Sequence, residues 1–221
     1  MKTAPISCFF LVLASVLSGP ILEAQSPPPA TGPAIQLFDG RDFSGLAFCM
    51  KNGADPMKTW SIANGVIHCT GKPIGYLRTT QIYSNYVLTV DWRFLKVRPK
   101  ADNTGVLVHI QGPDKVWPLC VQVQGRYMHQ GDIFVMEGAE AKEHAGMDKN
   151  MPVRMHGKPN EKPVGQWNTC VTVCSNNVVN AFVNGKWMNR ITHCSVSSGC
   201  VGIQSEGGDI EIRRMFLQPL K

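Results

Sequence analysis

The chain has 221 residues, a formal net charge of +6 and 43% hydrophobic residues. Its basic residues form small scattered groups such as Arg213-Arg214, without the basic stripe interleaved with aromatic residues that nucleic-acid binding requires, so we expect no nucleic-acid partner. Beyond the first two dozen residues, no apolar run has the length of a membrane span.

Residues 1–24 have the layout of a cleavable secretory signal peptide. Lys2 precedes an apolar run from Cys8 to Leu17, which is followed by Gly19-Pro20 and by the small residue Ala24. The run is too short to cross roughly 30 Å of hydrocarbon, so a membrane anchor is the less favoured interpretation. We therefore expect a secreted or periplasmic protein that is free of the membrane once the signal is removed.

Residues 25–34 contain Pro27-Pro28-Pro29 and Pro33 and predict an extended spacer, because proline fixes the backbone and lacks the donor that helices and central strands need. The remaining residues 35–221 are enough for one well-buried core but not for two. We expect a single domain over this range, and the sequence leaves its oligomeric state open.

Of the eight cysteines in the chain, Cys8 lies in the signal segment, which leaves seven in the mature protein. An odd number leaves at least one thiol without an intramolecular partner. The pairs Cys170 with Cys174 and Cys194 with Cys200 have spacings that could indicate zinc, but the first pair falls in a strand pattern rather than on a loop. We expect disulfides or buried thiols, with the pairing undetermined.

Alternation of apolar and polar residues predicts short strands along most of the chain. The longest covers residues 86–94 and places Tyr86, Leu88, Val90, Trp92 and Phe94 on one face. Further strands are predicted over residues 105–111, 120–124, 170–174, 178–183, 186–188, 201–205 and 210–213, with a tight hairpin at Asn184-Gly185. Many short strands separated by glycine, proline and asparagine are typical of an all-β antiparallel sandwich or jelly roll.

The same alternation assigns side chains to the two faces of the strands. Val106, Val108 and Ile110 are expected to face the core, as are Val121 with Val123 and Val171 with Val173. His109, Gln122 and Gln124 are then expected on the opposite, polar face. Residues 138–165 lack alternation and predict a long functional or mobile loop, with a short helix around residues 139–144.

Several motifs, in this order and spacing, resemble one family of proteins across almost the whole mature chain. They are Leu37-Phe38-Asp39-Gly40, Trp60-Ser61-Ile62, Asn85-Tyr86-Val87-Leu88, Asp91-Trp92-Arg93-Phe94, Asn103-Thr104-Gly105-Val106, Trp117-Pro118 leading to Gln124, Gly131-Asp132-Ile133-Phe134, Trp167-Asn168-Thr169, Val183-Asn184-Gly185, and Gly202 to Gly207. From about Ile35 to Leu220 the chain is similar to the 3-keto-disaccharide hydrolases. That resemblance implies a sandwich like those of the concanavalin A-type lectins and glucanases.

The resemblance also implies a carbohydrate substrate already oxidised to a ketone at sugar carbon 3. The ketone acidifies the hydrogen on carbon 2, so a base can remove it, the aglycone leaves from carbon 1, and water adds back. Such a reaction needs a base, an acid for the leaving oxygen, and a donor or cation that holds the enolate. Ordinary glycoside hydrolysis would instead need two carboxylates that flank the bond.

We select two residues as catalytic candidates. His109 is a candidate base because an imidazole titrates near neutral pH, although a histidine simply held on a sheet face is an equally good interpretation. Glu206 precedes Gly207-Gly208, where backbone can approach a ligand, and is the best candidate carboxylate, with a turn-stabilising role as the alternative. The expected substrate-binding residues are Gln122, Gln124, Gln204, Arg78, Arg93, Asp132 and Trp117.

These binding candidates rest on side-chain chemistry. Amides and the carboxylate of Asp132 can bind hydroxyl groups, the two arginines can orient hydroxyls or hold an enolate, and Trp117 can stack on a sugar ring, as can Trp187 and Tyr127. Trp60, Trp92 and Trp167 are expected in the core. A divalent cation bound by His129, His144 or His156 with carboxylates is a weaker expectation, since no spacing specifies it, and no other cofactor is expected.

One position departs from the family pattern. Relatives commonly carry a glutamate two residues before the strand glutamine, where this chain has Gln122. An amide cannot exchange a proton, so two hypotheses stay open. The protein is either an exported enzyme that cleaves 3-keto-glycosides through other residues, or a lectin-like module that binds carbohydrate without cleaving it.

Overall fold

The computed structural model describes residues 32–98 and 102–220, so the predicted signal peptide and most of the proline-rich spacer lie outside the described residues. Within these ranges the chain forms strands and three short 3-10 turns, at Lys51–Gly53, Pro56–Lys58 and Lys142–His144, and no α-helix. None of the described helices has the length and apolar character of a membrane span. The last 3-10 turn falls within the short helix predicted at residues 139–144.

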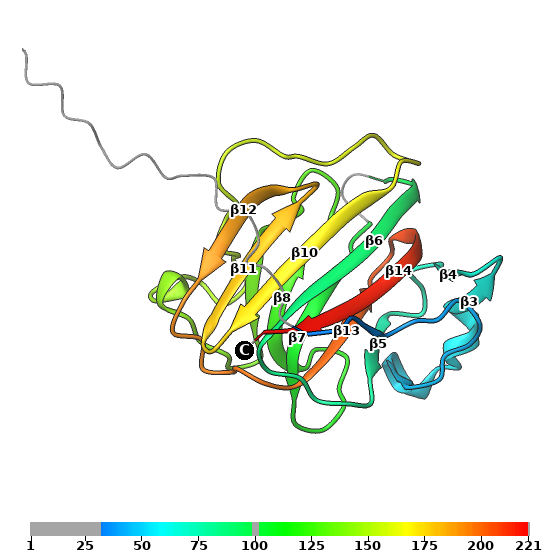
Figure 1. Cartoon of the computed structure of the whole chain (residues 1–221), viewed down its shortest axis with the longest axis horizontal. Helices are drawn as coiled ribbons and strands as arrows, with labels where there is room; N and C mark the ends of the chain where they lie inside the picture. Colours follow the sequence, from blue (N-terminus) through cyan, green and yellow to red (C-terminus); the bar gives the residue numbers. More distant parts are fainter. Residues whose placement is uncertain (1–31, 99–101, 221) are drawn as a thin grey trace, which may run out of the picture.

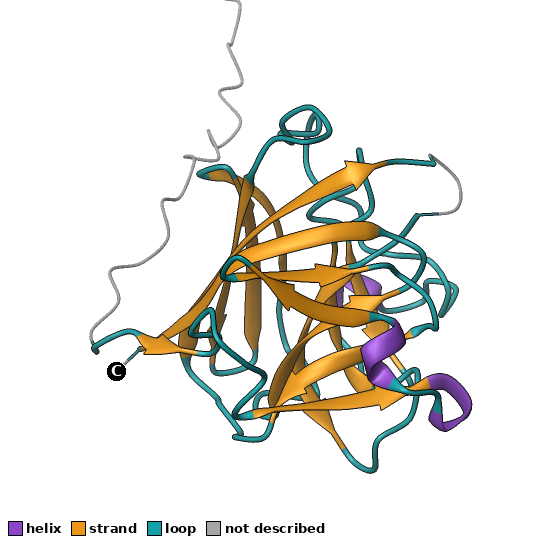
Figure 2. Ribbon diagram, turned by 90° about the vertical axis from the view of Figure 1, so that its right-hand side faces the viewer, coloured by secondary structure: helices purple, strands orange, loops and turns teal. Residues whose placement is uncertain are grey.

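Two antiparallel sheets pack face to face, which confirms the predicted β-sandwich (Figures 1 and 2). The first sheet has eight strands, and β1 joins it by pairing with β14. In order across this sheet the strands are β12 (Lys186–Ile191), β11 (Val178–Val183), β10 (Asn168–Ser175), β6 (Tyr86–Lys96), β14 (Asp209–Pro219), β4 (Val66–Cys69) and β3 (Trp60–Ala63), with β1 (Ile35–Gln36) at the side of β14.

The second sheet has six strands and carries the candidate site. Its order is β2 (Leu46–Met50), β5 (Gly75–Thr79), β13 (Cys200–Ser205), β7 (Gly105–Gln111), β8 (Leu119–Gln124) and β9 (Ile133–Met136). Figure 1 shows β7 and β8 of this sheet behind β10 and β6 of the first. Strands β7 and β13 are distant in sequence but adjacent in the sheet, so side chains near residues 105 and 204 come together.

The core lies between the sheets and is lined by the inward faces of their strands. Tyr86, Leu88, Val90, Trp92 and Phe94 all belong to it, as predicted for the long strand β6. Val106, Val108, Val121 and Val123 meet them from the six-stranded sheet, also as predicted. Strict alternation along β6 and β8 therefore determines which face of each sheet is buried.

The faces predicted for β10 are reversed. Cys170 and Cys174 point into the core, while Val171 and Val173 lie on the outer face, where Val173 packs against Val87 and Phe182. The pairing explains the reversal, since Cys170 lies opposite Val90 and residues directly opposite one another share a face. The thiols occupy these positions as small buried apolar groups.

All seven cysteines of the described chain are free thiols, which decides between the two alternatives left by the sequence. Five of them are buried, and Cys49 and Cys200 are half-buried. Burial raises the pKa of the Cys69 and Cys194 thiols to about 11, which keeps them protonated and inert.

The largest departure from the predicted pattern is a bulge at His109 in β7. The pairing of β7 with β8 shifts register between Val108 and Gln111, and His109 has a φ of 57°. A bulge inserts one residue and interrupts the alternation. His109 therefore turns into the core, and Ile110, which was expected there, packs on the outer face with Leu107.

Candidate functional site

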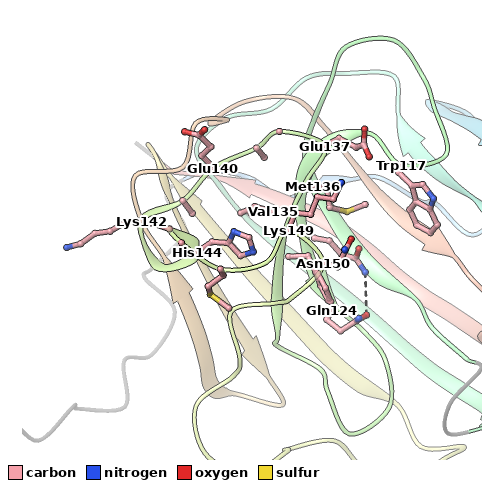
Figure 3. Close-up of a pocket in the computed structure, with 18 of the residues that line it drawn as sticks. Trp117, Gln124, Val135, Met136, Glu137, Glu140, Lys142, His144, Lys149 and Asn150 are labelled. Carbon is pink, nitrogen blue, oxygen red and sulfur yellow. Dashed lines mark hydrogen bonds between the residues drawn. The ribbon is translucent and has the colours of Figure 1, made fainter.

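A pocket of about 1200 Å³ lies on the outer face of the six-stranded sheet (Figure 3). Its floor is polar and includes Asn103 before β7, Gln122 and Gln124 on β8, and Gln204 with Glu206 at the end of β13. Five of the residues selected from the sequence, Trp117, Gln122, Gln124, Gln204 and Glu206, line this one pocket. Alternation along β8 and β13 places their amides on the outer face.

Residues 137–150 form one wall of the pocket, and the loop between β7 and β8 carries Trp117 on another side. In the view of Figure 3, Glu140, Lys142 and His144 lie on one side, and Trp117 with Glu137 on the other. Lys115 and Glu137 join the two loops through an ion pair of 2.9 Å. The long loop predicted from the sequence thus lines the site.

The loop that carries Trp117 is held to the sheet by Asp114. The Tyr76 hydroxyl donates to its Oδ1 over 2.9 Å, and Arg78 donates from Nε over 2.8 Å and from Nη2 to Oδ2 over 2.7 Å. These bonds lower the pKa of Asp114, most of all the one from Arg78. Arg78 therefore does not line the pocket as predicted but supports one of its loops.

The three glutamines of the floor form a connected chain of hydrogen bonds. Gln124 Oε1 accepts from the backbone N–H of Gly125 over 2.9 Å and of Arg126 over 3.2 Å. Gln122 Nε2 donates to Gln204 Oε1 over 3.0 Å and to Gln124 Oε1 over 3.4 Å. All three side chains are buried, so their amide groups are held in one arrangement.

Gly105 makes room for this chain. A Cβ atom on residue 105 would come within 2.7 Å of Gln122 Nε2 and 3.0 Å of the Val123 carbonyl oxygen. Residue 105 pairs with Gln124 across the sheet. Any side chain here would displace the central amide, so glycine is needed for packing rather than for backbone conformation.

Glu206 is the carboxylate of the floor. Asn103 Nδ2 donates to its Oε2 over 2.5 Å, and Asn103 itself is oriented because its Oδ1 accepts from the backbone N–H of Thr104 over 3.0 Å. Burial raises the pKa of Glu206, and the bond from Asn103 lowers it in part. A carboxyl group with a raised pKa in a pocket is suited to proton transfer.

Two histidines line the pocket, the exposed His193 and the half-buried His144, and the sequence pointed to His144 only as a cation ligand. One of the ring nitrogens of His144, Nε2, lies 2.9 Å from the carbonyl oxygen of Met151. A carbonyl only accepts, so Nε2 carries a hydrogen and Nδ1 remains to take or give a proton. No motif around residue 144 would have shown that the loop returns over the sheet.

Besides Arg78, three predicted site residues lie outside the pocket: His109, Arg93 and Asp132. His109 is 1% exposed and packs edge-on against Tyr86, with ring centroids 5.8 Å apart, so its placement on the polar face is wrong. Burial lowers the pKa of His109, and the nearby backbone of Ser84 and Val196 raises it by a smaller amount. The bulge in β7 is the physical reason that it left the polar face.

Arg93 and Asp132 are structural rather than part of the pocket. Arg93 belongs to the eight-stranded sheet, where it pairs with Glu211 at 2.6 Å and stacks on Trp167. Asp132 is buried and accepts from Arg154 Nη1 and from the backbone N–H of Met155, each over 2.8 Å. It ties the segment after the pocket wall to the turn before β9.

Of the aromatic residues considered for sugar stacking, one lines the pocket and two pack elsewhere. Trp117 borders the pocket and is 36% exposed, so one of its faces is open to a ligand. Trp187 stacks on His156 at 4.9 Å, and Tyr127 packs against Phe94. Trp60 and Trp92 are buried as expected, whereas Trp167 is half-buried between the guanidinium groups of Arg93 and Arg213.

The described residues contain no group of three or more histidine, cysteine, aspartate or glutamate side chains placed to hold a metal ion. The three histidines considered for a cation have different surroundings. His144 lines the pocket, His129 lies 3.5 Å from Asp132, and His156 stacks on Trp187.

The family is decided by comparison of the sequence with known domain families. Residues 33–218 match the domain described as 3-keto-alpha-glucoside-1,2-lyase-like. The chain belongs to this family. No curated protein sequence matches it.

Solved structures similar to this family member share its fold. A candidate glycosyl hydrolase from Parabacteroides distasonis has a TM-score of 0.63 and 22% identity, over 86% of this chain and 94% of that one. A second from the same organism has a TM-score of 0.58 and 17% identity, over 85% and 100%. The carbohydrate-binding module CBM66 from Bacillus subtilis has a TM-score of 0.57 and 9% identity, over 79% and 95%.

Proposed function

We propose that this protein is an exported carbohydrate-active enzyme that cleaves 3-keto-glycosides by removing the proton on carbon 2. The observation that carries the proposal is the pocket, in which a half-buried carboxyl group, Glu206, lies beside a floor of three oriented amides. Family membership adds the substrate class. A carbohydrate ligand suits such a floor because its oxygens need both donors and acceptors.

The proposed reaction has two halves. The carboxylate of Glu206 takes the hydrogen on carbon 2 as a proton, and the electron pair of that bond moves toward the ketone oxygen to give an enolate. When the enolate reforms the ketone, a double bond forms between carbons 1 and 2 and the bond from carbon 1 to the aglycone oxygen breaks. The aglycone oxygen takes a proton from His144. In the second half His144 takes a proton from water, whose hydroxyl adds to carbon 1, and Glu206 returns its proton to carbon 2. Both groups regain their starting states, and the net reaction is hydrolysis.

The environments of the two groups support these roles. Glu206 has a raised pKa and is therefore a stronger base than an exposed carboxylate, while the amide of Asn103 holds its other oxygen. His144 can present a hydrogen on Nδ1 while Nε2 stays bonded to the Met151 carbonyl, so the ring keeps its orientation in either charge state. Trp117 offers an aromatic face for a sugar or aglycone ring.

Incubating the purified mature protein with a 3-keto-disaccharide and following released sugar by chromatography tests the proposal. We expect release by the wild type, and loss of release in Glu206→Gln and His144→Gln. Gln36→Glu, an exposed change on the eight-stranded sheet, is the control and should release sugar like the wild type. No release by the wild type, with or without added divalent cations, would overturn the proposal.

The export that we propose rests on residues 1–24. Expression of the full chain with its own N-terminus in a bacterial host should yield a protein that begins at or near Gln25 in the periplasm or medium. N-terminal sequencing of the recovered protein identifies the cut. Recovery of intact chain from the cytoplasm alone would contradict export.

The second candidate is a module that binds carbohydrate without cleaving it. Gln122 favours it, since a neutral amide stands where relatives carry a glutamate, and its Nε2 is tied to two other amides. Calorimetry that detects sugar binding, together with no product after prolonged incubation, would decide for the module.

A further inference from the structure

The orientation of the amides on the pocket floor is fixed by the backbone. Gln124 Oε1 accepts from two consecutive backbone N–H groups, Gly125 and Arg126, and a backbone N–H can only donate. The oxygen of Gln124 must therefore face the backbone, and its Nε2 must face away from it. If the Gln124 amide were flipped, its NH2 group would face the two backbone N–H groups, and no acceptor would lie between them.

The orientation of the Gln124 amide determines the orientations of the Gln122 and Gln204 amides. Because Gln124 Oε1 is an acceptor, the group of Gln122 that approaches it must be Nε2, and that same nitrogen reaches Gln204 Oε1. Gln204 therefore also has its oxygen turned toward Gln122 and its Nε2 turned away. The hydrogen bonds of the described residues use neither Nε2 of Gln124 nor Nε2 of Gln204.

Gln124 and Gln204 both line the pocket, and their oxygens meet at Gln122 Nε2, so the two free amino groups belong to neighbouring side chains of the floor. We infer that Nε2 of Gln124 and Nε2 of Gln204 together recognise the ketone oxygen of the substrate, which makes these two glutamines the residues that distinguish a keto sugar from its hydroxyl parent. This inference rests on the proposed function. A ketone oxygen accepts hydrogen bonds and cannot donate one, and it meets donors here.

The same arrangement serves the reaction. When the proton leaves carbon 2, negative charge moves onto the ketone oxygen, and fixed amide donors at that oxygen stabilise the charge as it develops. It also gives a reason for Gln122. Its one nitrogen supplies two hydrogens to two acceptor oxygens and so holds Gln124 and Gln204 in the orientation that leaves their amino groups free.

The test compares the affinity of the protein for a 3-keto-disaccharide and for the unoxidised disaccharide by calorimetry. Glu206→Gln protein is used so that the ligand is not consumed. We expect the keto sugar to bind about tenfold or more tightly than its parent, the effect of one well-placed hydrogen bond. Equal affinity for the two sugars would overturn the inference.

Two variants test the residues themselves. Gln124→Glu and Gln204→Glu each keep an oxygen where the chain needs an acceptor and replace only the free amino group by a second oxygen. We expect each to lose most of the preference for the keto sugar, while Gln36→Glu, which adds the same charge at an exposed site, keeps it. Full preference in both variants would contradict the inference.

The outcomes separate the inference from the proposed function. Preference for the keto sugar without release of product by the wild type supports the inference and overturns cleavage. Release of product without preference supports cleavage and overturns the inference. Absence of binding to either sugar overturns both, provided that thermal unfolding of the proteins is cooperative.

Discussion

Glu206 is the residue whose protonation connects activity with stability. Burial raises its pKa above the ordinary value of 4.5. Between that value and the raised pKa, the folded protein binds more protons at Glu206 than the unfolded chain does. Glu206 therefore stabilises the folded protein progressively as the pH falls through this window, and above the window its half-buried charge destabilises the fold. The bond from Asn103 limits but does not cancel the effect.

We predict that Glu206→Gln lowers turnover of a 3-keto-disaccharide by about 10² to 10⁴, the usual range for a lost acid–base group. The variant should also lose the gain in stability on acidification that Glu206 supplies, and be at least as stable as the wild type at pH 7. Urea unfolding at pH 7 and pH 4.5, beside the kinetics, measures both. A variant with wild-type turnover would exclude Glu206 from proton transfer.

The ionisation of His109 changes the stability of the folded protein with pH in the opposite direction to that of Glu206. Its pKa is lowered by burial, so the unfolded chain binds more protons than the folded protein between the lowered pKa and the ordinary value of 6.5. Its contribution to folding is therefore complete above that window and is lost as the pH falls through it. The imidazole stays neutral in the core and serves packing.

We predict that His109→Asn, which tolerates a positive φ, is less stable than the wild type by about 1–3 kcal/mol at pH 7.5 because core packing is lost. Its stability should decline less than that of the wild type between pH 7.5 and pH 5. His193→Asn is a matched control, since His193 is exposed with a similar φ of 53°. An unchanged pH dependence would show that His109 does not titrate with unfolding.

The sequence predicted the amides of the floor better than the histidine. Gln122 and Gln124 lie two apart on a strand without irregularity, so alternation placed both on the outer face. His109 lies in a strand with the same apparent pattern, but a one-residue bulge reverses the faces of the side chains that follow it. No residue type near His109 predicts that bulge. His144 lay in a segment without periodicity, for which alternation offers no rule.

At the level of elements, the site depends on two loops anchored in different ways. Asp114 accepts hydrogen bonds from the hydroxyl of Tyr76, a fully buried residue, and from the guanidinium of Arg78. Lys115 and Glu137, in contrast, are both largely exposed. Exposed ion pairs contribute little, because both partners are well solvated when apart.

We predict that Asp114→Ala lowers stability by about 1–3 kcal/mol, since it leaves the Tyr76 hydroxyl without its acceptor, and that it weakens sugar binding by freeing the loop of Trp117. Lys115→Ala, one residue away, should change stability by less than about 1 kcal/mol. Thermal unfolding and calorimetry on both variants make the comparison. Equal effects would mean that the Asp114 bonds do not hold the loop.

Most strands from β6 onward were predictable because each alternates and ends at glycine, proline or asparagine. The faces of β10 were not, since cysteine and valine are both apolar enough to be buried and the sequence alone does not rank them. Pairing with β6 decided the matter. A strand with two apolar faces has its orientation set by its neighbour rather than by its own residues.

On the scale of the whole molecule, the fold gathers a site from distant segments without covalent cross-links. Asn103 and Glu206 form an isolated bridge between the start of β7 and the end of β13, which neither segment indicates alone. The sequence resemblance implied the sandwich, but the position of the pocket follows from strand order. The seven free thiols leave the cohesion of the sandwich to packing and hydrogen bonds.

We predict that a thiol-alkylating reagent modifies only Cys49 and Cys200 readily in the native protein, because the other five cysteines are buried. After unfolding, all seven should react without prior reduction. Mass spectrometry of the labelled protein counts the modified sites, and a reducing agent should leave the melting temperature unchanged. Cysteines that become reactive only after reduction would reveal a disulfide.

The wall of the pocket at residues 137–150 is one continuous stretch that contributes no strand to either sheet. Insertions in this stretch therefore leave every interstrand ladder intact, as long as the buried Ala139 and Ala141 keep their places in the core. Under the proposed function, we expect insertions and exchanges here to change which aglycones fit the pocket, while the amide floor stays constant. Chimaeras that transplant this stretch between relatives offer a direct route to new substrate ranges.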